Sequence, residues 1–185
     1  MIRKTGIVVF LLSMIAFSAT ATATPFEVSG SLGVGGCQGS CGGIDPGAQL
    51  RIGGQWNPYG GLGVGLSFSS QWLGGESMEG LYIRREGAEV SWTFWPHPRF
   101  SLRAGLEFGA AQTGFDVTTT GNGVESVSEN GTYGGISFRV GYRLIPHLTV
   151  FLETGYVYHL WGERNDNDFN SYYIVGGVSW SFDKQ

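Results

Sequence analysis

Beyond residue 23 the sequence contains one lysine, Lys184, and charged residues make up only 14% of the chain. A soluble β-sheet protein turns one strand face to water, and such faces are rich in lysine, glutamate and threonine. The shortage of lysine therefore argues against a soluble sheet protein. The formal net charge is −4, and an acidic surface repels nucleic acid, so we expect no nucleic-acid partner.

Long apolar runs are also scarce, and the only one lies near the N-terminus at residues 7–17. It follows Arg3 and Lys4 and precedes Ala21-Thr22-Ala23, an A-x-A cleavage site, which together predict a secretory signal peptide over residues 1–23. The run is shorter than the roughly 20 residues that span a bilayer as a helix. We expect residues 24–185 to form one domain.

The sequence has only two cysteines, Cys37 and Cys41, within "GGCQGSCGG". An exported chain meets an oxidising compartment, so this pair predicts a small disulfide. Three residues separate the cysteines, whereas a redox-active C-x-x-C motif has two, and no histidine lies near enough to complete a metal site.

Glycine and aromatic residues, by contrast, are abundant: the chain has 32 glycines, and 14% of its residues are aromatic. Apolar residues alternate with small or polar ones in eight segments, which is typical of strands with two different faces. Each segment has about the length of a tilted membrane-crossing strand, roughly 9–11 residues. The segments are residues 26–35, 47–56, 60–69, 86–95, 99–111, 132–143, 148–159 and 171–182.

The connections between these segments alternate between short and long. Short ones are expected at residues 57–59, 96–98 and 145–147, and the others are much longer. Short periplasmic turns and long extracellular loops are typical of outer-membrane barrels. The fold class predicted is all-β: a closed, eight-stranded, antiparallel, up-and-down transmembrane β-barrel in the outer membrane of a Gram-negative-type bacterium.

Aromatic residues are expected to form two girdles at the membrane interfaces. The turn-side girdle comprises Phe26, Trp56, Phe94, Phe100, Tyr142, Trp180 and Phe182, and the loop-side girdle comprises Phe68, Tyr82, Phe108, Tyr156, Tyr158 and Tyr172.

If even-numbered strand positions face lipid, the ionisable residues of the strands point inward. These are Glu27, Arg51, Glu89, Arg103, Glu107, Arg139, Arg143 and Glu153. The short turns predict Arg139 opposite Glu153, Arg51 opposite Gly65, and Glu89 opposite Gly105. An eight-stranded barrel is just wide enough for side chains to fill it, so we expect a plug of paired charges; a polar conduction path is the alternative.

The segments "YRLIPHLTVFLETGY" and "YYIVGGVSWSF" give the chain a resemblance to the small eight-stranded outer-membrane barrels of the OmpA transmembrane-domain, OmpX and opacity-protein kind. The resemblance implies a monomer surrounded by outer-membrane lipid and lipopolysaccharide, with a structural or adhesin-like surface-contact role. A narrow OmpW-like channel for small solutes is the alternative. A lipid A-modifying enzyme is less favoured, because His159 lacks the His-x-Ser arrangement of the deacylases.

Acidic residues outnumber basic ones in the long loops, where we place Arg84 and Arg85 among the few bases. The four long loops are numbered 1 to 4 in chain order. The longest is loop 3, residues 113–132, and it is rich in Gly, Thr and Ser. Loops 2 to 4 are candidate surfaces for an extracellular ligand. Asn165, Asp166, Asn167 and Asp168 offer oxygen ligands for calcium, but without the glycine and distal glutamate of an EF-hand loop. We therefore predict no metal site, cofactor or catalytic residue.

Overall fold

The computed structural model describes residues 26–39, 44–59, 61–75, 79–118, 124–161 and 169–182, and within these ranges it contains strands and turns but no helix. No helix in the described ranges is long and apolar enough to cross a membrane. The strands are β1 (Phe26–Gly39), β2 (Ile44–Asp45), β3 (Gly47–Tyr59), β4 (Leu62–Trp72), β5 (Gly74–Gly75), β6 (Glu79–His97), β7 (Phe100–Thr118), β8 (Val124–Ile145), β9 (Leu148–Trp161) and β10 (Phe169–Phe182).

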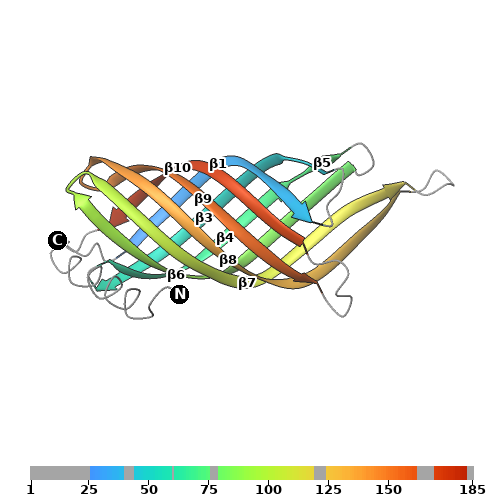
Figure 1. Ribbon diagram of the computed structural model, residues 1–185, viewed down its shortest axis with the longest axis horizontal. Helices are drawn as coiled ribbons and strands as arrows, with labels where there is room; N and C mark the ends of the chain where they lie inside the picture. Colours follow the sequence, from blue (N-terminus) through green and yellow to red (C-terminus); the bar gives the residue numbers. More distant parts are fainter. Residues whose placement is uncertain are drawn as a thin grey trace, which may run out of the picture.

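Eight of these strands form one closed barrel, in the order β1-β10-β9-β8-β7-β6-β4-β3, and every pair is antiparallel (Figure 1). The first strand closes the barrel against the last, from Phe26 opposite Phe182 to Gly39 opposite Phe169. Closure pairs the backbone of every long strand on both sides, as a bilayer requires. The predicted eight-stranded up-and-down barrel is confirmed.

Side chains alternate between the two faces of the barrel wall. Even-numbered apolar residues are exposed on the outside, with Leu66 at 72% and Leu106 at 60%, whereas inward Glu153 is only 2% exposed. The exposed large hydrophobic residues include most of both predicted girdles. The outer surface is therefore an apolar band suited to lipid, and the core lies in the lumen.

The β3–β4 connection differs from the prediction. Arg51 lies opposite Ser69, and Gln55 rather than Arg51 lies opposite Gly65, a shift of four residues. The strand continues through residues 57–59, with a bulge between Trp56 and Tyr59, and the chain reverses at Gly61, whose φ is 103°. Pro58 is accommodated in the irregular segment, where no ladder N–H is needed, so the proline did not mark the turn.

The β6–β7 connection also differs. Pro96 and His97 belong to β6, and the reversal occurs at Pro98 and Arg99. A bulge before His97 shifts the register by two residues, so Glu89 lies opposite Glu107 and not Gly105.

In the β8–β9 hairpin, Ile145 and not Leu144 pairs with Leu148. The irregularity at Leu144 offsets this one-residue change at the turn. Arg139 therefore lies opposite Glu153, as the sequence predicts, and Arg143 lies opposite Thr149. A bulge thus changed the turn but left the rest of the ladder in place.

The segment predicted as the longest loop is mostly strand. The β7–β8 ladder continues from Thr113 opposite Glu129 to Thr118 opposite Val124, and these two strands extend beyond the rest of the barrel (Figure 1). Its Gly, Thr and Ser content suggested a loop, but pairing with a neighbouring strand satisfies its backbone. A further two-stranded sheet, β2 with β5, joins the first two long connections.

Several predictions concern residues outside the described ranges. These are the signal peptide, Cys41 and the oxygen-rich group at residues 165–168. The disulfide between Cys37 and Cys41 and the cleavage after residue 23 therefore stay predictions.

Candidate functional site

The lumen is the candidate site, because strand alternation gathers the polar side chains there. We call the end with the β3–β4, β6–β7 and β8–β9 turns the turn end, and the opposite end the loop end. Seven of the eight ionisable residues predicted to face inward belong to one connected group, and the structure adds an eighth member from outside that prediction. The group comprises Glu27, Arg51, Arg85, Glu89, Arg103, Glu107, Arg139 and Glu153.

Arg51 is the centre of the group. Its guanidinium on β3 contacts Glu107 at 2.6 Å, Glu89 at 2.8 Å and Glu153 at 3.3 Å. Glu89 and Glu107 lie directly opposite each other on β6 and β7, and like charges in that position repel. Arg51 reaches both carboxylates from another strand, so it holds together a pair that would otherwise destabilise the wall.

A second set of ion pairs continues toward the turn end. Arg139 contacts Glu153 at 2.6 Å and Glu27 at 3.4 Å, and Arg103 contacts Glu27 at 2.9 Å. Arg103 and Arg139 are direct neighbours on β7 and β8, while Glu27 comes from β1, on the other side of the barrel. The carboxylate of Glu27 thus balances two adjacent cations across the lumen.

Tyr173 was not among the predicted site residues. Its hydroxyl is 3.1 Å from Glu153 Oε1 and 3.3 Å from Glu107 Oε1, within hydrogen-bonding distance of both. The ring is fully buried, and the Arg51 guanidinium lies 5.6 Å from its centroid. Tyr173 has an odd number, and the odd-numbered positions of β10 point inward. That rule could have identified it from the sequence.

Arg85 is a correction to the sequence analysis, which placed it in a surface loop. It lies on the inner face of β6, 3% exposed, and hydrogen-bonds to Ser69 at 3.0 Å, Ser171 at 3.1 Å and Gln71 at 3.3 Å. The Tyr173 ring, 5.8 Å away, separates it from the carboxylates. The strand predicted to begin at residue 86 in fact begins at Glu79. Extending the rule that odd-numbered positions face inward by one residue would have identified Arg85.

Arg143 behaves differently from the other predicted inward charges. Its guanidinium packs 4.1 Å from the centroid of the Trp95 ring and makes no ion pair among the described residues. It is partly exposed, in the turn-end part of β8. With Arg85 in place of Arg143, the lumen group contains four arginines and four glutamates, and its formal charge is zero.

The loop-end half of the lumen mixes apolar and aromatic side chains with buried polar ones, among them Gln49, Gln71 and Ser171. One cluster contains Ala111, Tyr133, Val157, Tyr173 and Val175, and another contains Leu73, Leu81 and Ile83 with Cys37 against it. His159 is also fully buried there, with its ring 6.3 Å from that of Tyr133. The lumen therefore has an ionic part and a mixed part that contains two apolar clusters.

The described residues offer little for catalysis or metal binding. They contain no group of three or more histidine, cysteine, aspartate or glutamate side chains placed to hold a metal ion. His159 lies inside the loop-end half, whereas His97 and His147 lie at turns. The three imidazoles therefore do not share a site.

Comparison with known proteins agrees with this geometry. Residues 7–182 match the family described as outer membrane protein beta-barrel domain. Among solved structures, Neisserial surface protein A has a TM-score of 0.72 at 16% identity, over 88% of this chain and 100% of that one. Ail, the attachment invasion locus protein of Yersinia pestis, has a TM-score of 0.61 at 16% identity, over 87% and 100%.

The outer membrane protein OprG from Pseudomonas aeruginosa is similar at a TM-score of 0.52 and 14% identity, over 88% of this chain and 97% of that one. At these identities the likeness shows the fold alone. A search of curated protein sequences gave no significant match. The family match spans nearly all of the sequence and agrees with the closed barrel and its apolar outer band. The chain therefore belongs to the outer membrane protein β-barrel domain family, and its place is the outer membrane.

Proposed function

We propose that this protein is a plugged, non-conducting barrel that acts at the cell surface through its extended β7–β8 hairpin. The observation that carries the proposal is the ionic network across the lumen. Arg51 on β3 contacts Glu153 on β9, and Glu27 on β1 contacts Arg103 on β7. These contacts join strands that are not neighbours in the wall, so they fill the interior and do not merely line it.

Opening such an interior to ions would be costly. Removing one partner of a buried ion pair typically costs about 3–5 kcal/mol, because the other charge is left without compensation. Arg51, Glu107 and Glu153 are each shared between several contacts, so separating one pair disturbs the rest. This coupling favours a plug over the alternative of a narrow solute channel.

The hairpin supports the contact role. β7 has 19 residues and β8 has 22, whereas β9 and β10 have 14 each. Ser128, Glu129 and Asn130 are exposed on it, and the segment also carries Asp116 and Glu125. An acidic projection favours cationic partners. The similar Yersinia pestis barrel is known as an attachment invasion locus protein, and it is an example of this fold with a contact role.

The contact role is tested by shortening the hairpin. Replacement of residues 115–127 by Asn-Gly leaves Gly114 opposite Ser128 and joins them by a two-residue turn of the kind that suits hairpins. Bacteria of a non-adherent strain that display the intact protein should adhere to epithelial cells or matrix-coated surfaces, and the shortened variant should lose that adherence.

An Asp116→Asn/Glu125→Gln variant with the full-length hairpin separates charge from shape. If adherence depends on a cationic partner, this variant should also adhere less. Lowering the salt concentration should then strengthen the adherence of the intact protein more than that of the variant, because fewer ions screen the attraction between the acidic hairpin and its cationic partner. Equal adherence of intact and shortened proteins, at equal surface display, would refute the contact role.

A further inference from the structure

The outer wall of the barrel carries an apolar groove of about 700 Å³. It lies on the lipid-facing side, because its lining is made largely by even-numbered, outward side chains. Among them are Trp92, Ala104, Leu106, Ile136, Phe138 and Tyr156.

The groove exists because a small residue stands between two large ones. Trp92 on β6, Ala104 on β7 and Phe138 on β8 occupy one rung of the sheet, so the methyl group of Ala104 forms a floor between two aromatic walls. The lining extends from Leu62 on β4 to Tyr172 on β10. The groove therefore follows the outer wall across several neighbouring strands, and its volume leaves room for a fatty acyl chain.

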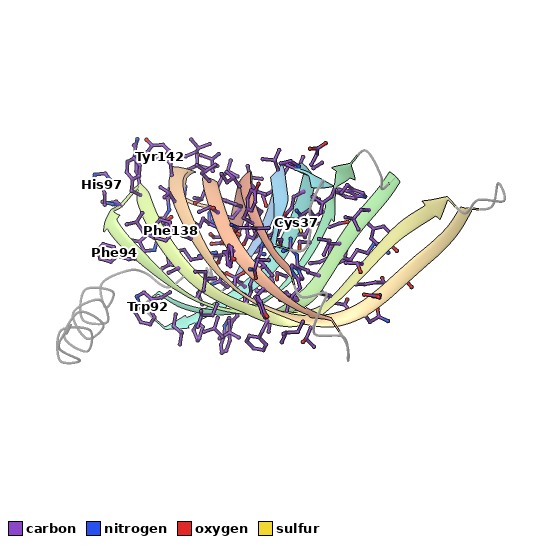
Figure 2. The ribbon with its side chains drawn as sticks, turned by 45° about the vertical axis from the view of Figure 1, so that its right-hand side comes forward. Cys37, Trp92, Phe94, His97, Phe138 and Tyr142 are labelled. Carbon is purple, nitrogen blue, oxygen red and sulfur yellow. The ribbon has the colours of Figure 1, made fainter. Side chains whose placement is uncertain are left out.

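A basic and aromatic corner lies at the turn end of the same strands. Arg99 Nη1 donates a hydrogen bond to the Tyr142 hydroxyl at 3.4 Å, and the Arg99 N–H donates to His97 Nδ1 at 3.3 Å. The Phe100 and Tyr142 rings pack edge to face, 5.0 Å apart. In Figure 2, His97, Tyr142, Phe94 and Trp92 all lie toward this same end of the barrel.

Among the described residues, the positive charge of this corner has no acidic partner. Arg99 and His97 are exposed, and no acidic side chain among the described residues forms an ion pair with Arg99. The Arg143 N–H donates to the Arg99 carbonyl at 2.8 Å, which holds the turn in place, while the Arg143 guanidinium packs on Trp95. Arginine and tyrosine at the membrane interface suit a phosphate group.

The corner and the groove are connected along β7. From Phe100 to Ala104 is four residues, roughly 13 Å along a strand, with outward Leu102 between them. We propose that this surface binds one anionic glycerophospholipid, with its phosphate on Arg99 and Tyr142 and one acyl chain in the groove over Ala104. The positive charge of the corner selects the anionic headgroup, and the apolar groove selects the chain.

The test measures phospholipid binding to the folded full-length barrel in detergent by native mass spectrometry, with phosphatidylglycerol and phosphatidylcholine as probes. Arg99→Gln removes the charge proposed to bind the headgroup. Arg84→Gln is its control, because Arg84 is another exposed arginine beside a tyrosine, with its guanidinium 5.0 Å from the Tyr82 ring centroid. Ala104→Phe fills the groove floor. Ala110→Phe is its control, since Ala110 is an exposed residue of β7 that does not line the groove.

The wild-type protein should retain phosphatidylglycerol in preference to phosphatidylcholine. Arg99→Gln should remove most of that preference, an effect of about tenfold for loss of a charge-assisted contact. Ala104→Phe should weaken both lipids, and the two control variants should match wild type. Heat-dependent gel mobility shows whether each variant is folded. The preference of the wild-type protein for phosphatidylglycerol tests the proposal even if a variant fails to fold.

Equal retention of the two lipids by the wild-type protein would overturn the proposal. So would tighter binding of lipid A than of phosphatidylglycerol, or a dimer that Ala104→Phe dissociates while lipid binding is unchanged.

Discussion

At the scale of single residues, the buried charges of the lumen are stabilised by shared partners and not by isolated ion pairs. Arg51 contacts three carboxylates, and Glu27 contacts two arginines. A buried charge with several partners is satisfied only while all of them are present. The consequence of a substitution therefore depends on how many contacts the residue holds.

Arg51→Met should destabilise the barrel most. It leaves Glu89, Glu107 and Glu153 buried together without the cation that they share, and we expect a loss of about 3–5 kcal/mol in the free energy of unfolding. Urea or guanidinium titration in detergent or lipid vesicles, followed by tryptophan fluorescence, measures it. Arg84→Met, at an exposed position, should change the same quantity by less than about 0.5 kcal/mol. Similar losses from both substitutions would contradict the shared-partner account.

A second substitution on the Arg51→Met background should restore part of the loss. Glu107→Gln removes one of the three carboxylates that lose Arg51, while keeping the side-chain shape. The double variant should be more stable than Arg51→Met alone, although Glu107→Gln by itself should destabilise the wild-type protein. Simple additivity of the two effects would mean that the residues are not coupled.

Tyr173→Phe removes only a hydroxyl, and that hydroxyl serves both Glu107 and Glu153. Losing a hydrogen bond to a charged group costs about 1.5–3 kcal/mol, so the variant should fold but unfold at a lower denaturant concentration. An unchanged unfolding midpoint would show that the hydroxyl does not stabilise the carboxylates.

At the scale of strands, close approach of the backbones limits which residues fit. A Cβ atom added to Gly33 on β1 would collide with the carbonyl oxygen of Ile174 on β10, the strand that closes the barrel, whereas one added to Gly30 meets nothing within 4 Å. Gly33→Ala should therefore cost about 1–3 kcal/mol by overpacking. Gly30→Ala on the same strand is the control and should be nearly neutral. The same denaturant titration separates them, and equal effects would contradict the seam geometry.

The strands also show what sequence reasoning can and cannot recover. Period-two alternation identified all eight barrel strands, because one face meets lipid and the other a packed lumen. The predicted partners of Arg51 and Glu89 were wrong, since bulges beside Pro58 and Pro96 insert residues that alternation does not reveal. Arg139 opposite Glu153 was recovered because the extra residue at Leu144 is offset by a turn one residue shorter than predicted.

The lumen residues that were missed have a similar explanation. Arg85 was assigned to a loop because its strand begins earlier than its apolar alternation, at Glu79. The apolar clusters of the lumen were not anticipated, because inward Val157, Val175 and Ile83 interrupt the expected polar face. Which side chains meet across the lumen depends on the tilt and stagger of the strands, and neither quantity is encoded in local periodicity.

At the scale of the whole molecule, closure and an apolar outer band should make the folded barrel resist detergent until it is heated. Unboiled samples should migrate differently from boiled ones on a dodecyl sulfate gel. Identical migration, together with solubility in buffer without detergent, would contradict the membrane-barrel assignment.

The proposed contact role depends on our proposal that the lumen is sealed, since a barrel that does not conduct leaves its surfaces for function. The most direct test of the sealed lumen is single-channel recording in planar bilayers. The wild-type protein should show no steady openings, while Arg51→Ala/Arg139→Ala, which removes both cations in contact with Glu153, should show small conductance events. Steady wild-type openings that disappear in that double variant would contradict the plugged barrel and support a solute channel instead.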